Sequence, residues 1–481
     1  MENKENGRKH VVVVGGGISG LSAAFYLKSA LAGRHVEADI SIVEKSDMFG
    51  GKIRTLHRDG FVIEQGPDSF LARKLPMIEL TRDLGLEREL TGLNPKANKT
   101  YIVHKGKLHR MPRGLSLGVP TEIKPFMTTN LISPFGKARA AMDYVLPRRK
   151  ETGDESVGDF FERRLGKEVL ANIAEPILAG IYAGDTYKLS LEATFPQFHQ
   201  VEQTYGSLIK GMTAGKLNPP PPSKLSEIVP HKDRSSVFLT YRKGLVTVLE
   251  GLRGALQDTT DIKAEVKGLE RDNGSYKLML DEGDTLEADA VILALPAYAM
   301  APLLKTVPDT GWLGEMDYVS VANVVLAFDK DSLNHPLDGS GFVIPRTEGR
   351  FITACTWTSS KWLHTAPEGK ALIRCYVGRS GDQDWKSLSD DEIVSRVRHD
   401  LLELMGIREE PLFVEVTRLN RSMPQYQVGH MERIRRLRER LVADLPGTFV
   451  TGAAFEGVGI PDCVRQAKDA AEAAASYLAG V

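Results

Sequence analysis

The sequence predicts an α/β protein built around a doubly wound sheet of parallel strands. Residues 11–14 (VVVV) suit a strand buried on both faces. Residues 18–31, rich in Ala and Leu, suit a helix packed on it, and residues 40–44 suit a second strand. The C-terminus repeats this order, with "TFVTGAAF" as a strand and "GVGIPDCVRQAKDAAEAAASYLAG" as a glycine turn and helix. Strand, glycine turn and helix therefore recur at both ends of the chain.

The size and composition indicate an ordinary globular protein with more than one domain. The chain has 481 residues, of which 42% are hydrophobic and 26% charged. This length is too great for one core, so two or three domains are expected. The formal net charge of −1 argues against a general nucleic-acid binder.

The cysteines and the apolar runs favour a soluble, cytoplasmic protein without a transmembrane segment. The first nine residues are polar, and the apolar stretch 290–304 is shorter than a bilayer span and contains two prolines. The cysteines form neither a C-x-x-C pair nor an even set, so free thiols in a reducing compartment are expected; they are Cys355, Cys375 and Cys463.

The expected secondary structure changes twice in the middle of the chain. Residues 115–187 have mostly helical spacing, and "LNPPPPSKL" (217–225) then breaks the pattern as a surface loop or linker. A helix is expected over 241–256, followed by strands that turn at Asn273-Gly274. Beyond them, strands are expected at 288–297, 320–328 and 371–377 and a helix at 391–405.

The first candidate binding motif is Gly15-x-Gly17-x-x-Gly20, which has the spacing of the dinucleotide fingerprint. One glycine allows the tight turn, one lets backbone approach the pyrophosphate, and one lets helix and strand pack closely. The helix behind it would offer unpaired N–H groups, so Gly16, Ile18 and Ser19 also become cofactor candidates. Taken alone the motif is weak, because glycine-rich turns also arise for packing reasons.

Glu44 ends the second predicted strand, where a carboxylate accepts both hydroxyls of an adenosine ribose. An acid at this position disfavours a 2′-phosphate and therefore NADP. The alternative is a solvated glutamate at a strand end. The fingerprint upstream favours the ribose role.

The following residues, "KSDMFGGKIRT" and "GFVIEQGPDSF", resemble the FAD-binding signature of amine-oxidase and glutathione-reductase type flavoproteins. The resemblance implies a Rossmann-like FAD-binding domain and non-covalent FAD. Lys52 stands where many members carry Arg, and Arg54 is a candidate cation beside the flavin. An adenine-side backbone contact is implied at Val266. The further cofactor contacts that the resemblance implies are Lys45, Gly66, Pro67, Asp68, Ser69, Val458, Gly459 and Ile460.

A narrower resemblance rests on "GPDSFLARK", "EPILAGIYAGD", "RCYVGR", "SMPQY" and "EGVGIPDC". Together these segments are similar to the oxygen-dependent porphyrinogen oxidases of the haem pathway, nearest to the soluble bacterial, coproporphyrin-forming type. The resemblance implies a dehydrogenation of coproporphyrinogen III in three flavin cycles with O₂ as acceptor and H₂O₂ as product. Protoporphyrinogen IX would also be accepted, and transient contact with other haem-pathway enzymes would be possible. Leu419 departs from the pattern, since an aromatic residue is expected there.

A porphyrinogen is a large apolar ring that carries propionates at its edge. Its binding site therefore requires a wide apolar slot with cations at the rim. Arg73 and Lys74 are rim candidates, although ordinary surface charge explains them equally well. Gly180, Ile181 and Ala183 would line the slot, or else form a helix end capped by glycine.

Tyr376 would stack on the macrocycle, or be a core tyrosine of a strand. Arg113 and Arg379 are more speculative rim candidates. We expect no general base, because a flavin takes the hydride and the protein supplies mainly orientation. No metal site is expected from the spacing of the histidines.

The expected FAD-binding domain combines residues 1–85, 226–300 and 416–481. An inserted α+β substrate-binding domain would use 86–108 and 301–415, and a helical domain 109–225. Three other functions stay open. A covalent-flavin amine oxidase needs a cysteine in the C-terminal turn, whereas Cys463 lies beyond it. A carotenoid-type desaturase would favour an apolar mouth over Arg73 and Lys74, and a non-catalytic flavoprotein is the third alternative.

Overall fold

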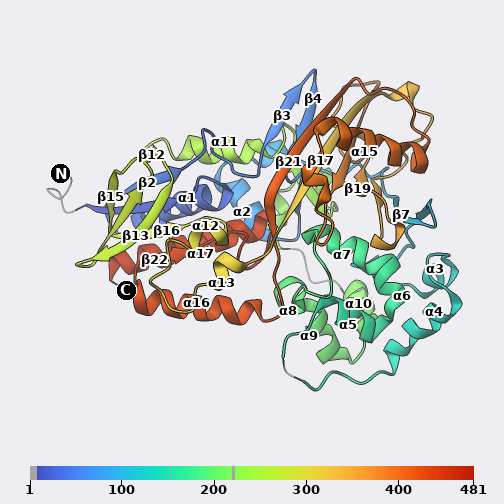
Figure 1. The fold of residues 1–481 in the computed structure, drawn as a ribbon, viewed down its shortest axis with the longest axis horizontal. Coiled ribbons are helices and arrows are strands. Elements are labelled where there is room, and N and C mark those ends of the chain that lie inside the picture. The colour runs from blue at the N-terminus through green and yellow to red at the C-terminus, as the bar shows by residue number, and fades with distance from the viewer. Residues whose placement is uncertain (1–7, 152, 219–222, 481) are drawn as a thin grey trace.

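A five-stranded parallel sheet forms one end of the molecule, as the computed structural model shows for residues 8–151, 153–218 and 223–480 (Figure 1). The strand order is β12-β2-β1-β16-β22. The bounds are β1 (Lys9–Val14), β2 (Ala38–Glu44), β12 (Thr260–Lys263), β16 (Ala290–Leu293) and β22 (Thr448–Val450). The predicted α/β fold with a parallel sheet is confirmed, because strands from both ends of the chain pair side by side.

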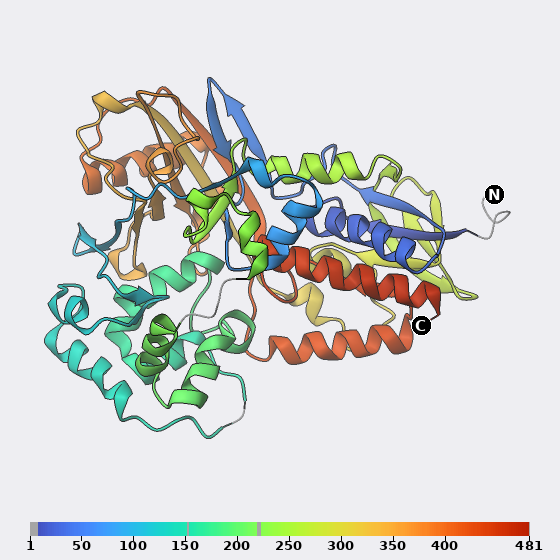
Figure 2. The same cartoon turned by 180° about the vertical axis from the view of Figure 1, so that it is seen from behind.

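Both faces of this sheet are covered, which explains its run of valines. Val11 and Val13 face α1 (Ile18–Gly33), α11 (Val246–Ala255) and α17 (Ile460–Ala479). Val12 and Val14 face the other way, into the core beneath a three-stranded meander. Figures 1 and 2 show α1 and α17 lying along each other on one face. The meander consists of β13 (Val266–Asp272), β14 (Ser275–Leu280) and β15 (Thr285–Ala288), and it turns at Asn273-Gly274 as predicted.

A seven-stranded sheet forms the upper part of Figure 1, in the order β21-β17-β20-β19-β18-β7-β8. The bounds are β7 (Thr100–His104), β8 (Lys107–Arg110), β17 (Tyr318–Asp329), β18 (Gly341–Val343), β19 (Ile352–Thr356), β20 (Lys370–Val377) and β21 (Phe413–Pro424). Helix α15 (Asp390–Met405) covers one face of the sheet. Ser389 and Glu392 form a capping box at its start.

The helical part of the chain lies below this sheet in Figure 1. It contains α3 (Ile123–Thr128), α4 (Pro134–Ala141), α5 (Val157–Leu165), α6 (Lys167–Val169), α7 (Glu175–Tyr182), α8 (Leu191–Thr194), α9 (Pro196–Tyr205) and α10 (Leu208–Leu217). Its centre is a cluster of buried aromatic rings from Phe160, Phe161 and Phe198. Of the predicted proline loop, residues 219–222 lie outside the described part of the chain.

Smaller elements connect these parts. They are β3 (Thr55–Arg58), β4 (Phe61–Glu64), β5 (Phe70–Leu71), α2 (Leu75–Asp83), β6 (Leu90–Gly92), β9 (Leu115–Ser116), β10 (Val119–Pro120), β11 (Phe238–Tyr241), α12 (Ala297–Met300), α13 (Trp312–Glu315), α14 (Thr358–Lys361) and α16 (His430–Asp444). Within the described residues, none of the helices is long and apolar enough to cross a membrane.

Two expectations need correction. The helix predicted over 241–256 begins only at Val246, because Tyr241 ends β11 and is fully buried there. Residues 416–424, assigned to the cofactor domain, continue β21 at the edge of the seven-stranded sheet. The rest of the three-domain division remains a proposal.

Candidate functional site

The loop between β1 and α1 can be built only with glycine at two positions. Gly15 has a φ of +108°, and a Cβ there would lie 2.6 Å from the carbonyl oxygen of Ala294. A Cβ on Gly20 would lie 1.8 Å from the carbonyl oxygen of Gly15. Helix α1 begins directly behind the loop at Ile18, and its N-cap, Gly17, makes no side-chain capping bond. The first N–H groups of a 16-residue helix, including that of Ser19, therefore face the loop, as a phosphate requires.

Glu44 extends from the end of β2 toward this loop. Its Oε2 accepts a hydrogen bond from the Gly16 N–H at 2.7 Å, and its Oε1 accepts one from the Ser46 N–H at 2.8 Å. The neighbouring Lys45 is exposed. The Ala264 N–H donates to the Glu44 carbonyl oxygen at 3.1 Å, and Val266 follows two residues later. The predicted ribose acid ends β2, and the predicted adenine-side residue begins β13, directly after the strand β12 that pairs with β2.

Two further glycine segments pack against the first loop. The Gly50 N–H donates to the Gly16 carbonyl oxygen at 2.8 Å, and a Cβ on Gly51 would lie 3.3 Å from Gly17 Cα. A Cβ on Gly66 would lie 1.8 Å from the carbonyl oxygen of Lys52. Residues 50–52 are therefore layered between the fingerprint loop and the segment that begins at Gly66.

The Lys52 side chain links these loops to the end of β21. Its ammonium group donates to the carbonyl oxygen of Ser422. The side chain is accessible to solvent, but protein atoms surround it on most sides, and the resulting loss of hydration lowers the pKa of the ammonium group. Arg54, the other predicted cation, is exposed.

The turn between β22 and α17 completes the arrangement. Gly457 has a φ of +111°, and a Cβ there would lie 2.7 Å from Cγ of Asp462. Val458, Gly459 and Ile460 follow it into the first turn of a 20-residue helix. The four segments therefore gather at the carboxyl edge of the parallel sheet, which is where doubly wound folds bind ligands.

The arrangement of these residues fits a dinucleotide cofactor. Close backbone approach at Gly17, Gly51 and Gly66 leaves surfaces without side chains, and helices α1 and α17 direct N–H groups toward them. Glu44 supplies a carboxylate for ribose hydroxyls.

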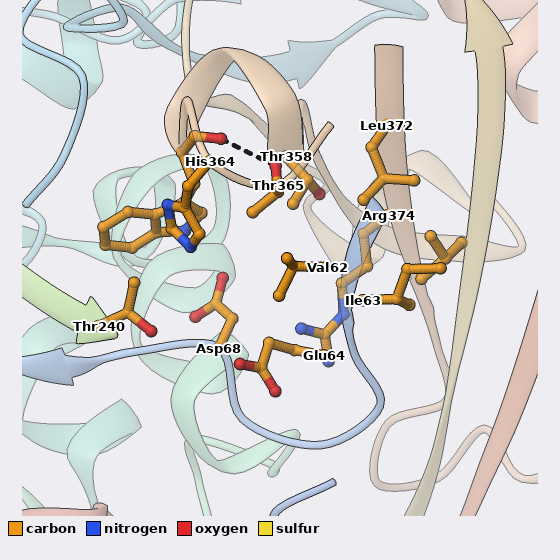
Figure 3. A pocket seen from close by; sticks show the side chains of 12 residues that line it. Val62, Ile63, Glu64, Asp68, Thr240, Thr358, His364, Thr365, Leu372 and Arg374 are labelled. Atoms are coloured by element: carbon orange, nitrogen blue, oxygen red, sulfur yellow. Dashed lines mark hydrogen bonds between the residues drawn. The ribbon is translucent and has the colours of Figure 1, made fainter. Parts of the chain in front are cut away.

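A buried polar cluster lies behind the Gly66 segment (Figure 3). Glu64, Asp68 and Arg374 line an enclosed cavity of about 10 Å³, the size of one water molecule. The Arg374 guanidinium donates to the carbonyl oxygen of Gly66, and the Lys361 ammonium lies 3.2 Å from Oδ2 of Asp68. The Ser69 hydroxyl donates to Oδ1 of Asp68 at 2.7 Å. The cluster fixes the predicted cofactor segment Gly66–Ser69 to β20 of the seven-stranded sheet and to α14.

The two carboxyl groups of the cluster differ in acidity. Burial raises the pKa of Glu64 to about 8, although the Leu245 N–H and the Thr55 hydroxyl donate to its carboxylate. Burial also opposes ionisation of Asp68, but the charges of Lys361 and Arg374 outweigh it and hold that pKa well below its usual range. At neutral pH Glu64 is therefore mostly protonated and Asp68 is charged.

One face of the seven-stranded sheet meets the same segment. Asn323 and Tyr376 are opposite each other on β17 and β20, and the Asn323 amide donates to the carbonyl oxygen of Gln65 at 2.9 Å. The Arg374 guanidinium lies 4.9 Å from the centre of the half-buried Tyr376 ring. Leu419 pairs with Val321, two residues before Asn323, and so lies on this face too. The predicted stacking residue thus belongs to the face that is turned toward the cofactor segment.

The end of α7 forms another part of the site. Gly180 and Ile181 are exposed, and the helix ends with Ala183 in the left-handed conformation at a φ of +50°. The alternative of a glycine cap is therefore wrong, because the left-handed residue is an alanine. The Ser380 N–H donates to the Ala183 carbonyl oxygen at 2.7 Å, so the loop after β20 holds this strained end.

The candidate rim cations are placed differently from one another. Arg73 and Arg113 are exposed. The Lys74 ammonium pairs with Oδ2 of Asp462 at 2.5 Å, in the first turn of α17. Arg379 is only 7% exposed and lies 4.0 Å from Asp382, so it is not a free rim cation in this structure.

Sequence reasoning missed Asp462, Arg374 and Tyr426, which tie the segments together. Arg374 could have been found, because in "RCYVGR" it alternates with Tyr376 and must share its face. The ion pair of Asp462 with Lys74 joins positions 388 residues apart, and no local sequence pattern predicts such a contact.

The glycine segments 15–20, 50–52, 66–69 and 457–460 form a cradle beside the parallel sheet. This cradle and the fold define a flavoprotein class. Residues 18–475 match the model of the family described as flavin containing amine oxidoreductase, and the chain belongs to this family. The predicted flavin cofactor, FAD, is confirmed by that membership.

Several similar proteins carry more specific names than the family does. The chain is 47% identical to the coproporphyrinogen III oxidase of Bacillus subtilis (strain 168), over 98% of this chain and 99% of that protein. It is 42% identical to the coproporphyrinogen III oxidase of Staphylococcus aureus (strain NCTC 8325 / PS 47), over 96% and 98%. A crystal structure from Exiguobacterium sp. 255-15, provisionally assigned as a protoporphyrinogen oxidase, is 35% identical over 96% of this chain and 98% of that one, with a TM-score of 0.85. The predicted resemblance to porphyrinogen oxidases is confirmed.

Proposed function

We propose that this chain is an FAD-dependent oxidase that converts coproporphyrinogen III to coproporphyrin III, with O₂ reduced to H₂O₂. The observation that carries the proposal is 47% identity, over nearly the whole of both chains, to a coproporphyrinogen III oxidase. The geometry supports it, because the face bearing Tyr376 contacts the segment before Gly66, and the exposed end of α7 is bound to the loop that follows the strand of Tyr376. Protoporphyrinogen IX, a similar ring with two fewer carboxylates, would be a poorer substrate.

The cofactor-binding residues follow from the cradle. We assign FAD contacts to Gly15, Gly16, Gly17, Ile18, Ser19, Gly20, Glu44, Lys45, Lys52, Gly66, Pro67, Asp68, Ser69, Val266, Val458, Gly459 and Ile460. When bound, FAD accepts hydride from the substrate and passes electrons to O₂. The protein supplies position: Glu44 holds ribose, the N-termini of α1 and α17 face negative charge, and Tyr376 and Ile181 contact the macrocycle.

The rim cations orient the substrate by its propionates. Arg73 and Lys74 lie on the segment that follows the Gly66 turn, and we assign them to one side of the mouth of the site. The protein needs no general base, because protons can leave through the pyrrole N–H groups of the macrocycle.

We propose that FAD is held without a covalent bond. Cys463 is buried inside α17, and burial raises the pKa of its thiol to about 11, so the nucleophilic thiolate is scarce at neutral pH. Acid precipitation should release all of the yellow colour into the supernatant. Flavin retained on the washed precipitate would contradict this assignment.

One assay tests the reaction. Purified protein with FAD is mixed with coproporphyrinogen III in air, and porphyrin fluorescence, oxygen uptake and peroxide are followed together. Coproporphyrin formation with stoichiometric peroxide supports the proposal. Turnover of an amine or a carotenoid in place of porphyrinogen would instead support one of the rival flavoenzymes, and the absence of any turnover would support a binding module.

A further inference from the structure

The segment 422–430, which runs from the end of β21 to the start of α16, connects three parts of the site. The carbonyl oxygen of Ser422 accepts the ammonium group of Lys52, in the second glycine segment. The Gln425 amide donates to the carbonyl oxygen of Tyr182 at 2.9 Å, at the end of α7. These contacts hold the Ser422 backbone and the Gln425 side chain, which both lie just before Tyr426.

Tyr426 carries the third connection. Its hydroxyl donates to the carbonyl oxygen of Ala453 at 2.6 Å and accepts from the Gly457 N–H at 3.1 Å. The side chain is 0% exposed, and its ring stacks on His430 with centroids 4.3 Å apart. One oxygen atom thus bridges the two ends of the turn between β22 and α17.

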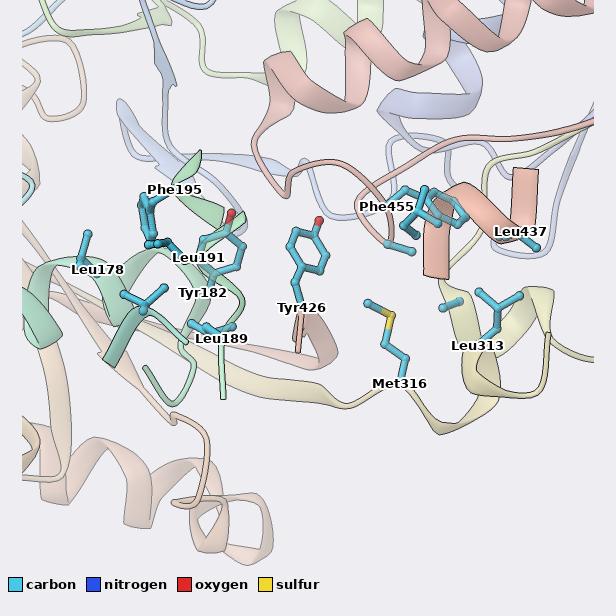
Figure 4. Packing of buried hydrophobic residues seen from close by; sticks show 14 of the residues in the cluster. Leu178, Tyr182, Leu189, Leu191, Phe195, Leu313, Met316, Tyr426, Leu437 and Phe455 are labelled. Atoms are coloured by element: carbon cyan, nitrogen blue, oxygen red, sulfur yellow. The ribbon is translucent and has the colours of Figure 1, made fainter. Parts of the chain in front are cut away.

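The neighbours of Tyr426 keep it in this place. Figure 4 shows its ring between Tyr182 on one side and Phe455 on the other. The Nε2 atom of His430 lies 2.8 Å from the carbonyl oxygen of Phe455, within the same turn. The turn is therefore held by three polar contacts from one stacked pair of rings.

We propose that Tyr426 is a positioning residue for the flavin, acting through the Gly457 turn. The turn leads from Gly457 into the first N–H groups of α17, and the hydroxyl fixes where those groups point. The inference rests on the proposed function, which assigns Val458, Gly459 and Ile460 to the flavin.

Tyr426→Phe tests this role, because it keeps the ring and removes one atom. The buried Gly457 N–H and Ala453 carbonyl lose their partner, and the turn is free to shift. We expect the Kd for FAD to rise roughly five- to a hundred-fold. The midpoint potential of bound flavin should also fall, since helix N–H groups stabilise the anionic reduced form most. A tenfold larger loss for reduced than for oxidised flavin corresponds to about 30 mV.

Tyr276→Phe is the matched control. Tyr276 is 1% exposed, and its hydroxyl donates to the carbonyl oxygen of Pro446 at 2.8 Å, at the opposite end of β22 from the turn. This variant should lose stability but keep the wild-type potential and Kd. His430→Phe, which keeps an aromatic ring and removes the contact with Phe455, should shift both in the same direction as Tyr426→Phe and serves as the test if the latter does not fold.

Two results would overturn the inference. One is a folded Tyr426→Phe protein with wild-type Kd and potential, and the other is an equal shift in Tyr276→Phe, which would indicate general loosening. A wild-type chain that binds no FAD would instead contradict the proposed function, so the two failures are distinguishable.

Discussion

At the scale of single residues, Glu44 shows how the site is organised before any ligand arrives. Its two carboxylate oxygens accept from the Gly16 N–H, the Ser46 N–H and the Ser46 hydroxyl. These donors fix the orientation of the carboxylate at the edge of the fingerprint loop, while lone pairs remain for ribose hydroxyls. Binding therefore costs little further ordering of this side chain.

Glu44→Ala should weaken FAD binding by about 1–3 kcal/mol, because ribose hydroxyls and the Gly16 N–H then lack an acceptor. The Kd is measured by quenching of FAD fluorescence. Glu37→Ala is the control, since Glu37 is an acid just before β2 whose side chain is 82% exposed. Equal Kd values for Glu44→Ala and the control would show that Glu44 does not hold the cofactor.

Glu64 should make stability depend on pH. Its folded-state pKa of about 8 is raised above the ordinary value of 4.5, so the folded state holds a proton that the unfolded state loses. Its contribution is therefore fully present below about pH 4.5 and is lost as the pH rises to about 8, with a slope of up to about 1.4 kcal/mol per pH unit. Glu64→Gln should flatten the decline in urea-unfolding free energy between pH 5 and 8. An unchanged slope in the variant would show that Glu64 ionises normally.

At the scale of elements, the helical part depends on one buried cation. Arg164 near the end of α5 is 0% exposed, and its Nε donates to Oδ1 of Asp143 at 2.6 Å. Its guanidinium also lies 3.3 Å from Glu202 of α9 and donates to the carbonyl oxygen of Gly206 at 2.9 Å. Two helices and the loop before them are thus joined at a single side chain.

Asp143→Ala should destabilise the protein by about 3–5 kcal/mol, because it leaves the buried Arg164 partly unpaired. Glu122→Ala removes one partner of an exposed pair with Lys216, whose side chains are 44% and 49% exposed, and should cost less than about 1 kcal/mol. Thermal unfolding of both variants measures the two losses of stability. Similar small losses in the two would mean that the buried pair contributes no more than a surface pair.

The elements that sequence predicted correctly are those with a local signal. The valine strand, the glycine loops and the alanine-rich α17 each carry their pattern within a few residues. Strand β11 was missed because its pairing depends on β5 and β6, which lie far away in the sequence. The alternative of a glycine cap on α7 was wrong for a similar reason: an alanine has no local signal for a left-handed conformation, which the Ser380 N–H stabilises from another element. The roles of Asp462 and Tyr426 likewise arise only from contacts made by the complete fold.

At the scale of the whole molecule, the parallel sheet, the seven-stranded sheet and the helical part meet at the cofactor segments. Charged contacts cross these borders: Lys361 of α14 pairs with Asp68, and Lys52 binds the end of β21. The Ser190 N–H of the helical part donates to the Tyr426 carbonyl oxygen at 2.8 Å. A substitution at one of these borders therefore disturbs contacts of more than one part of the site. The control substitutions lie away from these borders for this reason.

The last prediction concerns which porphyrinogen the assembled site selects. Coproporphyrinogen III carries four propionates and protoporphyrinogen IX only two, so a cation at the rim should favour the former. The Lys74 ammonium is paired with Asp462, and a substrate carboxylate would share or replace that partner. Lys74→Ala removes the cation and leaves the Asp462 carboxylate without this partner, so the KM for coproporphyrinogen III should rise several-fold, and that for protoporphyrinogen IX by less. The effect stays modest because the Lys74 side chain is 38% exposed and solvent screens it. Lys468→Ala is the matched control, since Lys468 forms a similar pair with Glu79 further along α17. If the two substrates keep equal specificity constants in the wild type and Lys74→Ala behaves like Lys468→Ala, carboxylate recognition does not select the substrate.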